Sequence, residues 1–301
     1  MSIKVNKITK KYGEQKALDN ISLDIKTGEI VGLLGPNGAG KTTMMKILTC
    51  YLPPTSGSAE VSELDVQKES IKVRRKVGYL PETNPLYHEM YVKEYLNFVA
   101  GIHKVKDRKK KVAEMIELTG LTPEAHKKIA ALSKGYKQRV GIAQAMIHEP
   151  EVLILDEPTS GLDPNQIVEI RNLIKKIGKE KTVLLSTHIM QEVEAMCDRV
   201  VIINKGKIVA DDNTENIYKY AKAEQKILEV EFDKPVSEKL LLQIKGISKV
   251  ENNKNQMLIY FDSKEDIRKE VFNLAVKENT AVISMNLQGA SIESVFRELT
   301  K

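Results

Sequence analysis

The sequence predicts an α/β protein whose mainly parallel sheet is buried between helices. Five short apolar runs, each with turn or charged residues at its ends, support this prediction: residues 30–34, 77–80, 152–155, 183–186 and 200–203. Continuous apolar runs of this length suit strands that are buried on both faces, as they are in parallel sheets. Helical patterns lie between the runs, which is the alternation typical of an α/β fold.

Two further segments of the first part differ from this pattern. Residues 21–25 alternate apolar and polar side chains, which predicts a half-exposed antiparallel strand. Residues 91–148 read as mostly helical and are inserted between two of the core strands. Apolar side chains recur there at helical spacing on one helix face: Tyr91, Tyr95, Phe98, Val99 and Ile102.

A change of pattern near residues 211–224 predicts a domain boundary. Beyond it the order of expected elements is strand, helix, strand, strand, helix, strand, helix, with a helix over 263–277 that begins at an N-cap, Ser263. We therefore expect a large domain over residues 1–215 and a small α+β accessory domain over residues 216–301.

Composition is ordinary for a globular protein. Of 301 residues, 42% are hydrophobic and 29% charged, and no apolar run reaches the length of a transmembrane helix. The N-terminal residues lack the apolar stretch of a signal peptide, so we expect the protein in the cytosol. Cys50 and Cys197 fit no metal-ligand spacing, and a cytosolic location argues against a disulfide between them.

The net charge of +6 is not evenly distributed. Residues 223–301 contain 12 basic and 13 acidic side chains, so residues 1–222 carry the excess, 35 against 28. A nucleic acid, a polyanionic nucleotide or an anionic membrane surface would each suit such an excess. The run 104–111 is also typical of a simple solvated lysine-rich face.

A glycine-rich loop follows the first buried strand and leads into a helical pattern. It comprises Gly35, Pro36, Asn37, Gly38, Ala39, Gly40, Lys41, Thr42 and Thr43. The glycines let backbone N–H groups approach phosphate oxygens, and the helix N-terminus adds a positive dipole end. Lys41 would reach the β- and γ-phosphates, Thr42 would bind Mg²⁺, and Thr43 would contact a further phosphate. The strand–loop–helix context favours this nucleotide site over an incidental turn.

Two adjacent acids, Asp156 and Glu157, follow another of the apolar runs. The carboxyl ends of parallel strands share the sheet edge at which ligands bind, so both acids should lie beside the glycine-rich loop. Asp156 would hold Mg²⁺, and Glu157 would polarise the water that attacks the γ-phosphate. His188, at the same edge, could contact the γ-phosphate. Taken alone, the acids also fit a strand entering a turn, and a lone histidine is more often structural.

The complete set of motifs resembles the nucleotide-binding domain of ABC transporters over about residues 1–215. The motifs occur in that family's order: Tyr12 with Ala17, the Walker A loop 35–42, the signature Leu132-Ser-Lys-Gly-Tyr136 followed by Lys137-Gln-Arg139, the Walker B residues Asp156 and Glu157, the D-loop Ser160-Gly-Leu-Asp163, and His188. The resemblance implies a P-loop ATPase fold with a mixed core sheet, an antiparallel β subdomain and a helical insertion. It also implies that Lys41, Glu157 and His188 are catalytic and that Tyr12 stacks on adenine.

The resemblance further implies that two such domains enclose two ATP molecules head to tail. Ser133, Gly135 and Tyr136 of one subunit would meet the γ-phosphate bound by the other, with Asp163 among the nucleotide contacts. From the residues alone, Ser133 and a helix beginning at Gly135 could offer a hydroxyl and a positive helix end to an anion, or could form an ordinary polar N-cap.

Two residues depart from the family pattern. Glu82 stands where the family usually has glutamine, and its carboxylate could still bind Mg²⁺. Tyr136 stands where glutamine is common in the signature. Both departures concern the control of hydrolysis rather than ATP binding.

The leading hypothesis is an ATP-hydrolysing subunit that drives a membrane permease from the cytoplasmic face. Residues 78–95 resemble gliding-motility-associated subunits, and residues 289–299 resemble the accessory domain of drug- and sodium-export ATPases. The charge excess leaves open a soluble ABC-type ATPase that acts on ribosomes or nucleic acid. A single cassette, in which Asp156 follows Lys41 by only 115 positions, argues against that alternative. Glu82 and Tyr136 also leave open a regulator that binds ATP without hydrolysing it.

Overall fold

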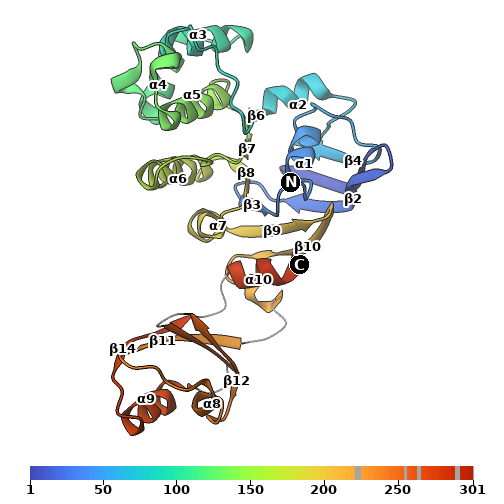
Figure 1. Ribbon diagram of the computed structural model, residues 1–301. Coiled ribbons are helices and arrows are strands. Elements are labelled where there is room, and N and C mark those ends of the chain that lie inside the picture. Colours follow the sequence, from blue (N-terminus) through green and yellow to red (C-terminus); the bar gives the residue numbers. More distant parts are fainter. Residues whose placement is uncertain (221–224, 254–255, 263–265, 289–291, 301) are drawn as a thin grey trace. The chain divides into compact units, whose positions relative to one another are not determined.

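The computed structural model describes residues 1–220, 225–253, 256–262, 266–288 and 292–300. The chain forms two compact units, Met1–Thr214 and Glu215–Leu299 (Figure 1). The first unit contains two sheets and a set of helices, and the second is a separate layer of strands and helices.

The central sheet of the first unit has six strands in the order β10-β9-β3-β8-β7-β6. Its strands are β3 (Ile30–Leu34), β6 (Val77–Leu80), β7 (Val152–Asp156), β8 (Thr182–Thr187), β9 (Arg199–Asn204) and β10 (Lys207–Asn213). All neighbours are parallel except β9 and β10, which form an antiparallel hairpin and make the sheet mixed. The five apolar runs are strands of this sheet, which confirms their prediction.

A second sheet of the first unit is antiparallel, in the order β2-β1-β4-β5. Its strands are β1 (Ile3–Tyr12), β2 (Gln15–Ile25), β4 (Ser56–Val61) and β5 (Leu64–Asp65). Ile21, Leu23 and Ile25 are buried while Ser22 and Asp24 are exposed, which confirms the predicted alternation. The buried face joins α1 (Lys41–Leu48) and the central sheet in one apolar core.

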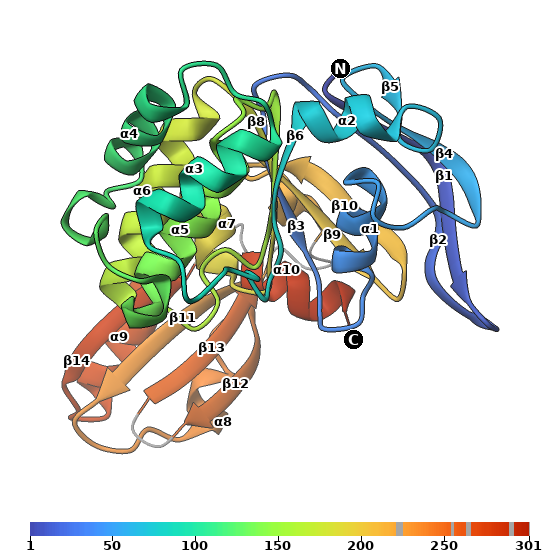
Figure 2. The ribbon, with the colours of Figure 1, turned by 90° about the horizontal axis from the view of Figure 1, so that it is seen from above.

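Helices occupy the segment between β6 and β7, as predicted. They are α3 (Val92–Ile102), α4 (Arg108–Leu118), the short 3₁₀ helices Thr122–Glu124 and Ile129–Ala131, and α5 (Lys134–Met146). Figures 1 and 2 show this insertion and the antiparallel sheet on opposite sides of the central sheet. The helix α2 (Ser70–Lys76) precedes β6.

The apolar side chains that recur on one face of α3 are only partly buried. Tyr95 and Val99 are buried, but Tyr91, Phe98 and Ile102 are 48%, 42% and 63% exposed. The face that packs against α4 and α5 is rotated relative to that apolar face, and its buried residues are Val92, Tyr95, Leu96, Val99 and Ala100.

Two helices follow the strands that carry the predicted acids and histidine. The helix α6 (Pro164–Gly178) comes after β7, and the short helix α7 (Met190–Met196) comes after β8. Since β3, β7 and β8 are parallel, the loops that follow them meet at one edge of the sheet. This edge holds the glycine-rich loop, Asp156, Glu157 and His188.

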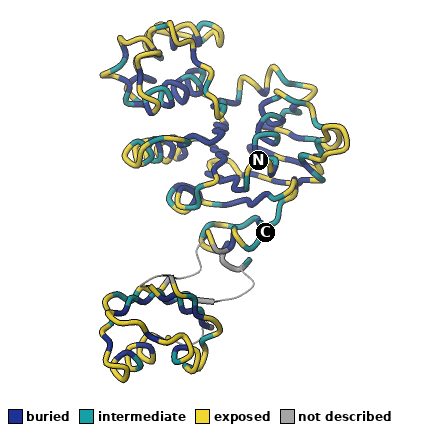
Figure 3. The backbone as a smooth tube through the Cα atoms, viewed as in Figure 1, coloured by how far each residue is buried: buried dark blue, intermediate teal, exposed yellow. Residues whose placement is uncertain are grey.

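The second unit contains a four-stranded antiparallel sheet in the order β12-β13-β11-β14. Its elements, after the 3₁₀ turn Ile217–Tyr220, are β11 (Gln225–Phe232), α8 (Glu238–Leu241), β12 (Ile247–Asn253), β13 (Gln256–Asp262), α9 (Arg268–Lys277), β14 (Val282–Gln288) and α10 (Ile292–Leu299). Their order is the predicted one. The helix expected from Ser263 begins at Arg268, and Ser263 lies outside the described residues. Strand residues such as Leu228, Ile259 and Phe261 form a core of their own with α8 and α9 (Figure 3).

Candidate nucleotide site

A cavity of about 470 Å³ lies at the loop between β3 and α1, within the size range of small-ligand pockets. Residues of β2, of the glycine-rich loop with the start of α1, and of the loops after β6, β7 and β8 line it: Ala17, Pro36, Asn37, Gly38, Ala39, Gly40, Lys41, Thr42, Thr43, Glu82, Glu157, Ser160 and His188. The structure therefore brings most of the predicted nucleotide, catalytic and metal residues together around one hollow.

The glycines of the loop are required by its geometry. A Cβ on Gly35 would lie 2.5 Å from the carbonyl oxygen of Ile203, and Gly40 has a φ of 114° with the Ala17 carbonyl 2.5 Å from where its Cβ would be. The helix α1 has no side-chain cap and no acidic residue in its first turn. Its first backbone N–H groups and its dipole are thus available to an anion in the cavity.

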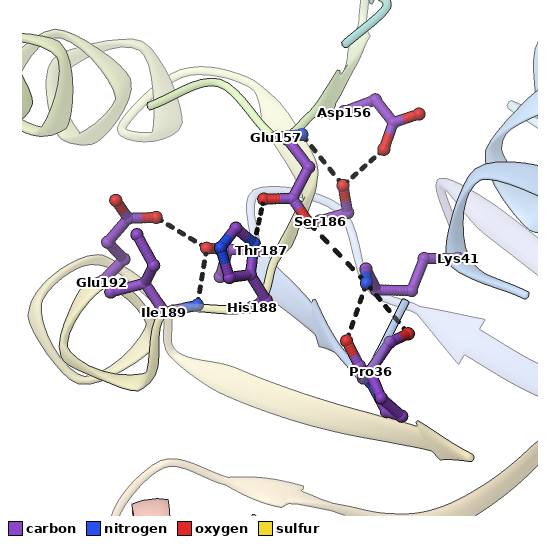
Figure 4. Close-up of polar contacts among 10 residues, drawn as sticks. Pro36, Lys41, Asp156, Glu157, Ser186, Thr187, His188, Ile189 and Glu192 are labelled. Carbon is purple, nitrogen blue, oxygen red and sulfur yellow. Dashed lines mark hydrogen bonds and ion pairs between the residues drawn. The ribbon is translucent and has the colours of Figure 1, made fainter. Parts of the chain in front are cut away.

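Lys41 is buried at the base of this cavity, with only 6% of its surface exposed. Its Nζ donates to the carbonyl oxygen of Gly35 at 2.7 Å and lies 3.7 Å from Glu157 Oε1 (Figure 4). A cation with so little access to water interacts strongly with a nearby anion, because solvent screens the attraction poorly. Lys41 is therefore suited to bind phosphate.

Ser186, which the sequence did not single out, joins the two acids at the end of β7. Its Oγ donates to Asp156 Oδ1 at 2.6 Å and accepts from the backbone N–H of Glu157 at 2.9 Å (Figure 4). Ser186 lies opposite Asp156 in the parallel ladder, so this contact follows from strand register. A hydroxyl at the end of an apolar strand was the signal for it. The second oxygen of Asp156, Oδ2, is buried and has no hydrogen-bond partner among the described residues.

Glu157 links the lysine and the histidine. Its φ of 51° is unusual for a residue other than glycine and directs the chain sharply away from the strand. Its Oε2 lies 2.8 Å from His188 Nδ1, while its Oε1 faces Lys41. A carboxylate can only accept, so Nδ1–H is the donor and Nε2 of the half-exposed ring remains available to a ligand. The arrangement can orient a water molecule and hold its proton.

Several predicted nucleotide residues do not line this cavity. Ser133 Oγ accepts from the backbone N–H of Tyr136 at 3.3 Å and is the N-cap of α5. The helix begins at Lys134, one residue before the predicted Gly135. Asp163 likewise caps α6 by accepting from the Gln166 N–H at 3.0 Å. Within one chain, Ser133 forms the polar N-cap that the sequence left as an alternative, and Asp163 forms a cap that the sequence did not predict.

Tyr12 also lies away from the cavity lining, although its predicted neighbour Ala17 belongs to it. The Tyr12 ring is half exposed on the hairpin of β1 and β2, and the Lys10 ammonium lies 5.4 Å from its centroid.

The loop after β6 connects the cavity to the helical insertion. Glu82 is exposed and lines the cavity. Asn84, two residues further on, donates from Nδ2 to the carbonyl oxygen of Lys137 in α5 at 2.8 Å. Sequence reasoning missed Asn84, because its partner lies 53 residues away. In the part of the chain that the structure describes, no helix is long and apolar enough to cross a membrane.

Comparison with known proteins identifies the family. A family model described as "ABC transporter" matches residues 18–160. The bacitracin transport ATP-binding protein BcrA of Bacillus licheniformis is 41% identical over 214 residues, which are 69% of each chain. The chain is an ABC transporter ATP-binding protein. As a member of this family of ATPases, it binds and hydrolyses ATP.

Other relatives of this ABC protein extend the similarity. The linearmycin resistance ATP-binding protein LnrL of Bacillus subtilis is 31% identical over 306 residues, covering 99% of this chain and 98% of that protein. The ATP-binding cassette MJ0796, solved as a post-hydrolysis dimer with ADP and Pi, matches 70% of this chain and 98% of its own with 29% identity and a TM-score of 0.65. These similarities confirm the predicted ABC ATPase fold, and such subunits work with membrane permeases.

Proposed function

We propose that this chain energises an export-type ABC transporter, with Glu157 as the residue that activates water for ATP hydrolysis. The observation that carries the proposal is the position of the Glu157 carboxyl group between Lys41 Nζ and His188 Nδ1 in the cavity of the glycine-rich loop. A base next to a phosphate-binding cation and an orienting histidine is the arrangement that phosphoryl transfer to water needs.

The nucleotide would lie along the cavity with its triphosphate on the loop. The backbone N–H groups of residues 35–43 would hold the phosphates, and Lys41 would bridge the β- and γ-phosphates. Tyr12 would stack on adenine beside Ala17. Glu157 would accept a proton from the attacking water, and His188 Nε2 would face the γ-phosphate.

Mg²⁺ would suit oxygen atoms in this cavity and at the end of β7 beside it. The buried Asp156 Oδ2 has no hydrogen-bond partner among the described residues, so a cation there would satisfy it. Thr42 and Glu82 line the cavity and would supply further oxygens. Bound Mg²⁺ would neutralise charge on the phosphates.

We propose that a second copy, or a paired ATP-binding subunit, completes the site. Ser133, Gly135, Tyr136 and Asp163 do not line the cavity of their own chain, yet they lie at the N-termini of α5 and α6, where positive helix ends can meet an anion. They would approach the triphosphate that the other subunit binds. The dimeric structure of MJ0796 with ADP and Pi supports such an assembly.

A mixed dimer tests this shared site. Subunits with Lys41→Ala lack the phosphate cation, and subunits with Ser133→Asp present a repelling carboxylate, so neither alone should hydrolyse ATP. Each mixed dimer contains one intact site, which combines Lys41 of the Ser133→Asp subunit with Ser133 of the Lys41→Ala subunit. Recovery of about a quarter of the wild-type rate, as random pairing gives, supports the shared site, and no recovery despite demonstrated mixing contradicts it. As the control, a Lys41→Ala/Ser133→Asp double variant is mixed with wild type. In that mixed dimer, each of the two sites contains one altered half, so neither site is intact.

The permease would bind the exposed aromatic and aliphatic side chains of the insertion. Tyr87, Tyr91, Phe98 and Ile102 are each more than 40% exposed, and the Tyr87 and Phe98 rings lie 5.8 Å apart. Exposed apolar groups gathered in this way mark interaction surfaces. The subunit would then lie on the cytoplasmic face of the membrane.

Affinity purification from membranes tests this partner. Recovery of an integral membrane protein by wild type, reduced by Phe98→Ser with Ile102→Ser, supports the transporter. Recovery of ribosomes or nucleic acid instead would favour the alternative that the charge excess suggests. BcrA is named for bacitracin transport and LnrL for linearmycin resistance. The identity of the recovered permease also separates drug export from the narrower gliding-motility subtype that residues 78–95 resemble.

A further inference from the structure

The turn that carries His188 is held by a buried carboxyl group with no role in the proposed chemistry. Glu192 lies in the first turn of α7 and is 0% exposed. Its Oε2 accepts a hydrogen bond of 2.7 Å from Thr187 Oγ1, and the same hydroxyl accepts one of 3.1 Å from the Ile189 N–H (Figure 4). His188 thus lies between Thr187, which carries this hydroxyl group, and Ile189, whose backbone N–H donates to it.

This arrangement differs from an ordinary capping box. In a capping box, a glutamate in the first helical turn accepts directly from the backbone N–H of the N-cap residue, here Ile189. In this turn, the Thr187 hydroxyl stands between the glutamate and that N–H. The hydrogen bonds therefore reach back across His188 to the last residue of β8.

Helix packing alone does not explain a carboxyl group at this position. Burying it costs free energy unless it is hydrogen-bonded, and Glu192 Oε1 has no partner among the described residues. The neighbouring buried positions of α7, Val193 and Met196, are apolar. An apolar side chain would suit packing better, so the carboxyl group is suited to a more specific task.

We infer that Glu192 is a positioning residue for His188. Through Thr187, it fixes the backbone on both sides of the histidine and so keeps Nδ1 at 2.8 Å from Glu157 Oε2. The inference rests on the proposed roles of His188 and Glu157. Small displacements of groups that orient a reactant reduce the rate of a reaction strongly.

Two pairs of variants test whether the hydrogen bond between Thr187 and Glu192, rather than the bulk of either side chain, is required. Glu192→Ala and Thr187→Val remove the acceptor and the donor, and each should lower kcat about tenfold, the effect of one lost hydrogen bond. KM for ATP should change less than about twofold, since neither residue lines the cavity. Glu192→Gln and Thr187→Ser keep the acceptor and the donor and should retain kcat within about threefold.

A matched control distinguishes positioning from loss of stability. Val193 is fully buried on the same helix, and Val193→Ala should lower the unfolding midpoint without lowering kcat at temperatures where the protein stays folded. If kcat follows the unfolding midpoint across Glu192→Ala, Thr187→Val and Val193→Ala alike, the role is structural and the inference is overturned.

A double-mutant cycle with His188→Ala completes the test. If Glu192 acts through His188, adding Glu192→Ala to His188→Ala should lower kcat by less than about twofold further. A further tenfold loss in the double variant would overturn the positioning role while leaving the role of His188 intact. If His188→Ala alone keeps the wild-type kcat, then the proposed role of His188 fails, and the inference fails with it.

Discussion

Glu157 shows how local geometry gives two adjacent acids different surroundings. Asp156 remains in the strand and accepts a hydrogen bond from Ser186. The left-handed backbone conformation of Glu157 directs its side chain towards Lys41 and His188. The sequence predicted different roles for the two acids, because they stand at the end of a buried strand. Sequence reasoning did not single out Ser186 or Glu192 as supports, since those contacts depend on strand register and on the turn into α7.

His148 provides a residue-scale prediction about pH. It is half-buried, its ring stacks on His103 at 4.0 Å between centroids, and its Nε2–H donates to the Val77 carbonyl at 3.1 Å. Burial, with the neighbouring His103 as a second cause, lowers the pKa of His148 from 6.5 to about 4. The unfolded chain therefore binds the proton more tightly, so the folded state loses stability as pH falls from 6.5 towards 4.

We expect His148→Gln, whose amide can still donate to Val77, to weaken this dependence. The measurement is the free energy of unfolding in urea at pH 7 and at pH 5, for wild type and variant. Wild type should lose more stability between the two pH values than His148→Gln does. The exposed His126, replaced in the same way, is the control. An equal loss in wild type and His148→Gln would contradict the account.

At the scale of elements, prediction worked best where burial leaves a simple pattern. The five apolar runs are strands because both of their faces are covered, and the alternation in 21–25 follows from one covered face. The face of α3 was harder to predict, because Tyr91, Phe98 and Ile102 are apolar yet lie beside the face that α4 and α5 cover. Apolar side chains also occur at interaction surfaces, and a single chain's sequence does not separate the two cases.

The N-terminus of α5 permits a prediction that separates capping from phosphate binding. Ser133 caps the helix, and aspartate caps helices equally well. Ser133→Asp should therefore keep the free energy of unfolding within about 0.5 kcal/mol of wild type, whereas Ser133→Ala should lose about 1 kcal/mol. ATP hydrolysis should show the opposite order, with Ser133→Asp the slower, because its carboxylate would repel the γ-phosphate. Urea unfolding and steady-state ATPase rates measure the two effects, and equal rates for both variants would count against the shared site.

At the scale of the whole molecule, the chain has two compact units, whereas the site lies within one. The domain limits 1–215 and 216–301 stay a prediction for the functional division, beside the structural units Met1–Thr214 and Glu215–Leu299. The second unit has its own buried core, including Val230, Ile259 and Val271. We propose that it has an accessory role in regulation or in subunit contact.

Calorimetry tests the independence of the two units. ATP with Mg²⁺ bound to the Glu157→Gln variant should raise the unfolding temperature of the first unit only, because a ligand stabilises the unit that binds it. At about 100 times Kd the stabilisation is about 2.7 kcal/mol. Two transitions, one of them unaffected by nucleotide, are expected. A single transition that shifts as a whole would show that the units unfold together.

The most direct test of the central claim compares ATP binding and ATP turnover in Glu157→Gln. The amide keeps the size of the side chain between Lys41 and His188 but is a far weaker base. We predict that the affinity for ATP with Mg²⁺ stays within about threefold, while single-turnover hydrolysis slows by about 100-fold or more, as expected when a general base is lost. Unchanged turnover in Glu157→Gln would contradict the account.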